Sequence, residues 1–275
     1  MALDLSGMDL TDIYPIKVHT HLRFLHLGNN HLDNASLEVL ANLPNLVSLY
    51  LNNNLVKSTT LPRFEYLQQL NLERNPIEQI DPIDQPLLQI LVLNETRIKS
   101  LRYIGYLSTP ILETLSAVSC RIENMIADYA LTMVNLFLAY NNIKLIESLQ
   151  GLSNLRRLHL RHNKISQLDG LTVGLDKLEY LNLRENQITD PHEIKKIKSL
   201  PSLSEILLMD NPVDDEMGSD IRPMVLMYSL ELARINKKFV NDEEVEYARS
   251  LIYEVEAEEE DIYLEGAHPG EDFDD

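Results

Sequence analysis

The hydrophobic positions of the chain recur in an eleven-residue pattern, with apolar residues at the first, fourth, sixth and eleventh places and asparagine usually at the ninth. The segment 155–165, LRRLHLRHNKI, is one copy. Nine copies follow one another, here called repeats one to nine, and they begin at residues 22, 46, 67, 88, 112, 133, 155, 178 and 203. A degenerate unit, residues 3–10, precedes them. The intervals of 21 to 25 residues predict a solenoid of stacked repeats.

The alternating places within each repeat predict a short strand, because side chains of a strand point to opposite faces in turn. Successive strands are expected to pair in parallel, with the third, fifth and seventh places outward on a concave face. The ninth-place asparagine follows the strand, where its side chain can hydrogen-bond buried backbone groups. Thr96 and Cys120 replace it in repeats four and five. We expect a local weakening there and not a break.

A second apolar set follows each turn at about three-residue spacing, as in the segment 165–171, ISQLDGL. This spacing is typical of short 3₁₀ or helical turns that return to the core from the convex side. The repeat length also lies within the range of roughly 20 to 29 residues found in leucine-rich repeats. The expected fold class is α/β: a leucine-rich repeat solenoid with a parallel concave sheet, a 3₁₀ or helical convex side, a C-terminal cap and a helix.

The segment 214–244 resembles the C-terminal capping motif of leucine-rich repeats of the phosphatase-regulator type. The positions that match its spacing are Arg222, Val225, Leu226, Ile235 and Asn236, with Leu230 in place of the motif's proline and Asn236 in place of its aspartate. The expected organisation is therefore a solenoid over residues 1–211, a cap over residues 212–240, and a helix with an acidic tail over residues 241–275.

The last part of the chain begins with a candidate helix N-cap, Asn241 or Asp242, followed by acidic residues that favour a helix N-terminus. A narrow apolar stripe predicts a helix of three to four turns. Residues 252–275 contain 11 acidic residues and no Lys or Arg. This composition fits a solvated tail or, alternatively, a docking segment for a basic surface.

The overall charge is −19, from 24 basic and 43 acidic residues, which argues against nucleic acid or an anionic membrane as the main partner. One cysteine cannot form an internal disulfide, and no run of 18 apolar residues occurs. We expect a cytoplasmic protein. The sequence has no phosphate-binding loop, nucleophile elbow or HExxH motif, so we predict no enzyme activity, no cofactor and no small-molecule substrate.

Four histidines near the N-terminus, His19, His21, His26 and His31, raise the question of a metal site. His26 is expected to point outward from a strand, whereas His31 falls in the turn of the same repeat. Convergence on one ion is therefore not expected, and we predict no metal site. Cys120 has a sufficient structural explanation at the ninth place of its repeat.

The outward places of repeats four to eight predict a protein-binding surface. Part of it is an apolar strip and part a basic, aromatic patch, residue types that are enriched where proteins bind one another. The predicted partner-binding residues are Ile90, Val92, Val118, Phe137, Arg157, His159, Arg161, Tyr180 and Arg184. We hypothesise that an acidic, amphipathic segment of a partner lies across them. The alternative is that they are ordinary solvated residues.

Repeat and cap together resemble intracellular leucine-rich repeat adaptors, a family that includes the phosphatase-one regulator and the spliceosomal A-prime protein. The segment 203–248 and the acidic end are similar to leucine-rich repeat subunits of ciliary radial spokes. That resemblance implies a structural subunit of the axoneme, in a cilium or flagellum, that contacts other radial-spoke subunits. A regulatory subunit of a phosphatase or other enzyme, and a spliceosome-type adaptor, stay open as alternatives.

Overall fold

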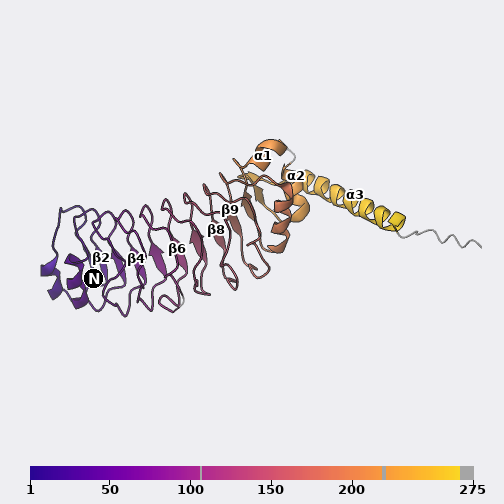
Figure 1. Ribbon diagram of the computed structural model, residues 1–275. Coiled ribbons are helices and arrows are strands. Elements are labelled where there is room, and N and C mark those ends of the chain that lie inside the picture. The colour runs from indigo at the N-terminus through magenta and orange to yellow at the C-terminus, as the bar shows by residue number, and fades with distance from the viewer. Residues whose placement is uncertain (106, 219–220, 267–275) are drawn as a thin grey trace, which may run out of the picture.

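The computed structural model describes residues 1–105, 107–218 and 221–266. Within these ranges, twelve short strands form one sheet in the order of the sequence, and the repeats stack into an elongated solenoid (Figure 1). The strands are β1 (Ala2–Asp4), β2 (Phe24–His26), β3 (Ser48–Tyr50), β4 (Gln69–Asn71), β5 (Ile90–Val92), β6 (Thr114–Ser116), β7 (Asn135–Phe137), β8 (Arg157–His159), β9 (Tyr180–Asn182), β10 (Glu205–Leu207), β11 (Arg234–Ile235) and β12 (Lys238–Phe239). The strands β2 to β10 occupy the third to fifth places of the nine repeats, as predicted.

From β1 to β11, neighbouring strands pair in parallel, and the repeats keep the same register throughout. The central leucines align across the sheet, for example Leu136 with Leu158 and Leu158 with Leu181. The degenerate N-terminal unit contributes β1, which pairs in parallel with β2. Because every repeat presents the same places to its neighbours, the fourth-place side chains form one buried row and the outward places form columns on the opposite face.

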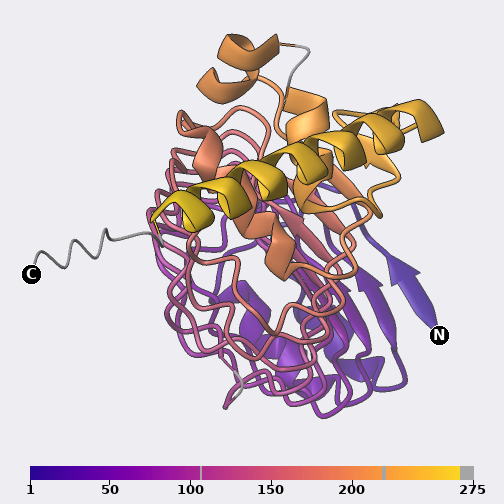
Figure 2. The same ribbon diagram turned by 90° about the vertical axis from the view of Figure 1, so that its right-hand side faces the viewer.

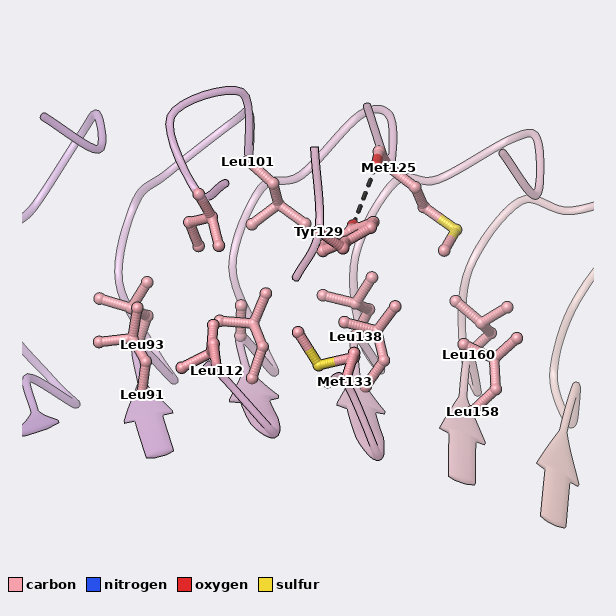
Figure 3. Close-up of a cluster of buried hydrophobic side chains, with 14 of the residues drawn as sticks. Leu91, Leu93, Leu101, Leu112, Met125, Tyr129, Met133, Leu138, Leu158 and Leu160 are labelled. Atoms are coloured by element: carbon pink, nitrogen blue, oxygen red, sulfur yellow. Dashed lines mark hydrogen bonds between the residues drawn. The ribbon is translucent and has the colours of Figure 1, made fainter. Parts of the chain in front are cut away.

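The core lies between the sheet and the convex loops. Figure 3 shows side chains such as Leu158 and Leu160 projecting inward from the strands toward residues returned by the convex loops. Both leucines are fully buried. Tyr129 fills a convex position of repeat five, and its buried hydroxyl donates a hydrogen bond to the Met125 carbonyl at 2.9 Å. Such burial removes apolar surface from water, which is the main source of stability in a repeat protein.

The convex side contains three 3₁₀ helices within the described ranges, η1 (Tyr14–Val18), η2 (Ser36–Asn42) and η3 (Pro191–Ser199). The predicted spacing of about three residues explains how they pack. Leu37 and Leu40 of η2, and Ile194 and Ile197 of η3, are all fully buried. The prediction of a 3₁₀ convex side is therefore confirmed in these repeats.

A ladder of buried asparagines runs along the strand exits. Asn163 is representative: its amide nitrogen donates to the carbonyls of Leu138 and Leu160 at 3.0 Å each and of Arg161 at 3.3 Å. Its amide oxygen accepts from the Ile143 N–H at 3.0 Å. One side chain thereby satisfies backbone groups of two repeats, which would be costly to bury without partners.

The residue before each ninth-place side chain adopts a left-handed backbone conformation. The φ angles lie between 54 and 60° at Asn29, Asn53, Arg74, Glu95, Ser119, Tyr140, His162, Glu185 and Asp210, the eighth places of the nine repeats. Non-glycine residues rarely adopt this conformation. Here the backbone is held by hydrogen bonds between repeats, such as that from the His162 N–H to the Arg184 carbonyl at 2.8 Å.

The ladder changes at repeats four and five. The Thr96 hydroxyl bonds to the Leu93 carbonyl at 2.8 Å, and the Cys120 thiol bonds to the same carbonyl at 3.2 Å. Neither side chain carries an amide oxygen, and within the described residues the N–H groups of Ile77 and Ile98 have no side-chain acceptor equivalent to that of Ile143. The strands continue through these repeats, as the sequence predicts.

The cap adds two helices and a hairpin to the C-terminal end, α1 (Pro212–Met217), α2 (Ile221–Tyr228) and the strands β11 and β12. The hairpin was not predicted; β11 pairs in parallel with β10, and β12 closes antiparallel on β11. Arg222 ties the cap together: its guanidinium donates to the carbonyls of Ile235 at 2.8 Å and Phe239 at 3.0 Å, and to the Glu244 carboxylate at 2.6 Å. Val225, Leu226 and Ile235 are fully buried beneath it.

The helix α3 (Asp242–Gly266) follows the cap. Asn241 is its N-cap, since the Asn241 side chain accepts from the Glu244 N–H at 2.9 Å and Glu244 bonds back to the Asn241 N–H at 3.0 Å. Figure 2 shows α3 in front of α2 at the C-terminal end of the solenoid, and Figure 1 shows that α3 projects beyond this end. The prediction of three to four turns was wrong, because the helix runs for 25 residues.

The cause of the greater length is the composition after the apolar stripe. The segment 256–260, EAEEE, consists of good helix formers, and it continues a helix that α2 already holds in place. Much of the predicted acidic tail is therefore helical, and residues 267–275 lie outside the described residues. In the described ranges, none of the helices combines the length and apolar character needed to cross a membrane.

Candidate functional site

The nine predicted partner-binding residues all lie at outward places of the sheet between repeats four and eight. Their positions follow from the strands: Ile90 and Val92 on β5, Phe137 on β7, Arg157 and His159 on β8, Tyr180 on β9, and Val118, Arg161 and Arg184 two residues beyond the ends of β6, β8 and β9. The parallel register brings repeats that are 21 to 25 residues apart in the sequence side by side. We call this surface the concave site.

The apolar part of the concave site is half-buried rather than fully exposed. Val92 pairs across the sheet with Ser116, and Ser116 pairs with Phe137. The small serine separates the two apolar residues, and its hydroxyl donates to the Asn94 side chain at 2.7 Å. The strip therefore has a polar gap on β6, which the sequence analysis did not take into account.

An aromatic row crosses the centre of the site. The ring of His159 meets Phe137 edge to face at 6.4 Å between centroids, and it meets Tyr180 in the same way at 6.2 Å. The Asn182 amide nitrogen lies 3.0 Å from His159 Nε2 and 3.0 Å from the Tyr180 hydroxyl. Because an amide nitrogen only donates, His159 Nε2 is the acceptor and the ring is neutral in this arrangement.

His159 is thus not a basic member of the site. Burial lowers the pKa of His159, and the neighbouring positive charge of Arg161 lowers this pKa further. Burial likewise raises the pKa of Tyr180. The row Phe137–His159–Tyr180 is an uncharged aromatic surface at neutral pH.

Two of the three arginines of the concave site are already paired with carboxylates. Arg161 bonds to Glu185 through Nε at 3.1 Å and through its terminal nitrogen at 2.5 Å. Arg184 contacts Asp210 at 2.6 Å and Glu185 at 3.2 Å. Hydrogen bonds from His162 and then from Arg161 lower the pKa of Glu185, and the hydrogen bond that Arg184 donates to Asp210 raises the pKa of Arg184.

Glu185 and Asp210 were not predicted, because both occupy eighth places and only the third, fifth and seventh places were expected to face outward. The available signal was the register, since the eighth place of one repeat lies beside the seventh place of the previous one. Two arginines and two carboxylates cancel in charge. The concave site is therefore closer to neutral than the sequence predicts.

Arg157 is the arginine of the site that stays exposed. Among the described residues it makes no ion pair, and its guanidinium lies 3.5 Å from the Asn135 side-chain oxygen. It borders a hollow of about 290 Å³ together with Tyr180 and the glutamates Glu179 and Glu205. Glu179 is paired with Arg156 and Glu205 lies 3.7 Å from Arg234, so Arg157 offers a free cation beside an aromatic ring.

The histidines His26 and His31 contact different partners, and Cys120 belongs to the ladder. The ring of His26 stacks on Tyr50 at 4.3 Å, while His31 lies 3.6 Å from Asp9 on the exposed turn. In the part of the chain that the structure describes, no group of three or more His, Cys, Asp or Glu side chains is arranged to hold a metal ion. Burial raises the pKa of the Cys120 thiol, which is consistent with its place in the ladder.

Comparison with known proteins agrees with this architecture. Models of leucine-rich repeats match residues 18–41, 132–173 and 153–213. The functional domain of InlJ from Listeria monocytogenes superposes with a TM-score of 0.65, at 21% identity over 85% of this chain and 48% of that chain. The leucine-rich repeat domain of APL1B superposes with a TM-score of 0.60, at 21% identity over 77% of this chain and 61% of that chain. At this identity the solved structures support the fold alone.

Fold and surface together define the class: the protein is a leucine-rich repeat scaffold of the kind that binds other proteins. Leucine-rich repeat-containing protein 23 of Bos taurus is 35% identical over 88% of this chain and 70% of its own length. The same protein of Homo sapiens is 33% identical over 88% of this chain and 69% of its own length. The chain belongs to the family of leucine-rich repeat-containing protein 23.

Proposed function

We propose that the protein is a non-enzymatic structural subunit of the ciliary or flagellar radial spoke, which holds partner subunits on its concave site. Membership of the leucine-rich repeat-containing protein 23 family supports a scaffold role. The resemblance of segment 203–248 to radial-spoke subunits supports the particular place in the axoneme. The acidic end beyond the cap agrees with the same resemblance.

The observation that carries the binding role is the aromatic row Phe137–His159–Tyr180, with the apolar strip of β5 and β6 next to Phe137 and with Arg157 next to Tyr180. These side chains stand on strands whose register and backbone are fixed by the asparagine ladder. A surface held in this way loses little conformational entropy on binding, which favours affinity. Aromatic and arginine side chains are also the types that contribute most at protein interfaces.

The chemistry of the site supports a narrower proposal for the partner than the sequence does. Since Arg161 and Arg184 are already neutralised, a densely acidic partner gains little from them. The proposed partner segment places apolar side chains against Val92 and Phe137 and one carboxylate against Arg157. It is a helix or an extended segment that lies across repeats four to eight.

The test is affinity purification with mass spectrometry from ciliated and non-ciliated cells, using three forms of the full chain. One is the natural chain, and the second carries Phe137→Ala, Arg157→Ala and Tyr180→Ala. The matched control carries Tyr66→Ala, Arg102→Ala and Tyr103→Ala, which remove the same kinds of side chain from exposed positions away from the concave site. Melting curves of all three establish that each is folded.

We expect axonemal spoke subunits to be captured from ciliated cells by the natural chain and by the control, and lost with the concave variant. Capture that the concave variant retains would show that the site is wrong. Capture of a phosphatase catalytic subunit from both cell types would favour the regulatory-subunit alternative instead.

A further inference from the structure

A second surface with a different chemistry lies on the flank of the solenoid, where the chain leaves the asparagine ladder. It is a groove of about 870 Å³, and the charged side chains that line it are Lys57, Glu78, Arg97, Lys99 and Arg121. We call it the lateral groove. These residues occupy the tenth and twelfth places of repeats two to five, so none of them belongs to the concave site.

The backbone beneath the lateral groove is regular. The Arg97 N–H donates to the Ile77 carbonyl at 2.8 Å, and the Arg121 N–H donates to the Ile98 carbonyl at 3.0 Å. The Glu123 N–H extends this pattern to the Lys99 carbonyl at 3.1 Å. The basic side chains therefore project from a flank whose shape is set before any ligand arrives.

The charges of the lateral groove are not neutralised within the protein. Arg97 and Glu78 approach to 3.8 Å with both side chains more than half exposed, a geometry that contributes little. Among the described residues, Lys57, Lys99 and Arg121 take part in no ion pair. Four basic groups face one acidic group here, on a chain whose net charge is −19.

We propose that the lateral groove binds an acidic, extended segment of a partner polypeptide, as a second docking surface beside the concave site. Repeats two to five are three strand spacings apart, so the groove extends for about 14 Å along the solenoid. An extended chain advances about 3.3 Å per residue, which places four to five residues in it. Alternate carboxylates of such a segment meet the basic side chains in turn, and Glu78 disfavours a continuous row of acids at that point.

Two other anionic occupants fit less well. Nucleic acid would bring a dense phosphate charge toward a protein of charge −19, where only the groove itself attracts it. A second copy of this chain carries acidic residues from 252 onward, but two copies of charge −19 repel each other as they approach. A partner with a local acidic segment and a less negative remainder avoids this repulsion.

The test is fluorescence anisotropy of a fluorescein-labelled decapeptide of alternating glutamate and serine with the full chain. The groove variant carries Lys57→Gln, Arg97→Gln, Lys99→Gln and Arg121→Gln. The matched control carries Lys177→Gln, Lys195→Gln, Lys198→Gln and Lys237→Gln, which lowers the net charge by the same amount at exposed positions elsewhere. The concave variant described above is the third arm.

We expect the groove variant to lose about tenfold or more in affinity for the decapeptide, because exposed ion pairs add modestly but four are removed together. The control and the concave variant should stay within about twofold, and binding should weaken as the salt concentration rises. An equal loss in the control would assign the effect to overall charge and overturn the proposal.

Two further probes decide the occupant. Oligouridylate that binds the groove more tightly than the decapeptide would overturn the proposal in favour of nucleic acid. A peptide of residues 252–275 that binds more tightly, together with self-association in sedimentation velocity, would overturn it in favour of a second copy. Weaker binding of both probes supports a partner polypeptide. Failure here leaves the concave site untouched, since that site is tested by different residues.

Discussion

Repeats six to eight and repeats four and five share one eleven-residue pattern but differ at the ninth place and on the surface. In repeats six to eight, asparagines join neighbouring repeats, and the concave arginines Arg161 and Arg184 are paired with carboxylates. In repeats four and five, Thr96 and Cys120 take the ninth place. The concave residues there include the apolar Ile90, Val92 and Val118 beside the polar Ser116, and the flank carries Arg97, Lys99 and Arg121 of the lateral groove.

The difference shows that a repeat can keep its regular core packing while polar groups at its surface stay free to bind a partner. The repeats with the full ladder satisfy their polar groups internally, whereas repeats four and five leave both backbone donors and surface charges less completely satisfied. At the first, fourth and sixth places both regions bury leucine, except for Ala117 in repeat five and Met133 in repeat six. The following predictions test how much of the free energy of unfolding depends on the asparagine ladder and how much depends on the buried leucines.

The largest effect is expected at the shared leucines. Leu160→Asp places a carboxylate in the fully buried core and should lower the free energy of unfolding by more than about 4 kcal/mol. Arg157→Asp, at an exposed place of the same repeat, should change it by less than about 0.5 kcal/mol. Thermal melts followed by circular dichroism measure both. A native melt for Leu160→Asp would show that the register is wrong.

The next largest effect distinguishes a ninth-place asparagine from a ninth-place threonine. Asn163→Ala removes four hydrogen bonds and leaves buried carbonyls and the Ile143 N–H without partners, which should cost about 3 kcal/mol. Thr96→Ala removes the bond to the Leu93 carbonyl and the weaker contact with the Cys120 thiol, and should cost about 1 kcal/mol. Urea denaturation gives both values. Equal losses of unfolding free energy would mean that the ninth-place side chain contributes the same stability in repeats six to eight as in repeats four and five.

Restoring the missing amide should strengthen repeat five. Cys120→Asn supplies an oxygen for the Ile98 N–H and a nitrogen for the Leu93 carbonyl, and we expect the free energy of unfolding to rise by about 1 kcal/mol. Cys120→Ala is the control, and it should lower the stability because it removes the thiol's bond. A loss in the asparagine variant would indicate that the thiol is adapted to Thr96 beside it.

The smallest effect is expected from His159. Its pKa is lowered in the folded chain, so the unfolded chain binds the proton more readily as the pH falls below the ordinary value of 6.5. The contribution to stability is present above pH 6.5 and is lost as the pH falls toward the lower folded pKa. Denaturation between about pH 5.5 and 7.5 should therefore show a weaker pH dependence for His159→Gln than for the natural chain.

The pH range chosen for the His159 experiment excludes a contribution from Glu185. The pKa of Glu185 is lowered from 4.5, so its contribution is present above pH 4.5 and is lost only in more acidic solution. An identical pH dependence in both chains would contradict the assignment of a neutral, half-buried His159.

Much of the fold could be predicted from the sequence, because the same eleven-residue pattern specifies the strand and the buried positions of each repeat. The alternation of Leu158 and Leu160 with Arg157 and His159 determines which side chains are buried, and the interval between repeats determines which strands are neighbours. Asn163 could be recognised as a member of the asparagine ladder for the same reason. The cap was recognised from Arg222 and its neighbours, but its hairpin was not, since two-residue strands have no periodicity to detect.

The chemistry of the surfaces was decided only by the tertiary structure. The pairing of Arg161 with Glu185 and of Arg184 with Asp210 joins residues 24 and 26 positions apart, and the neutral state of His159 depends on Asn182 one strand away. Hydrophobic burial repeats with the sequence and can be read from its period. Charge and protonation depend on distance and desolvation, which exist only once the repeats are stacked.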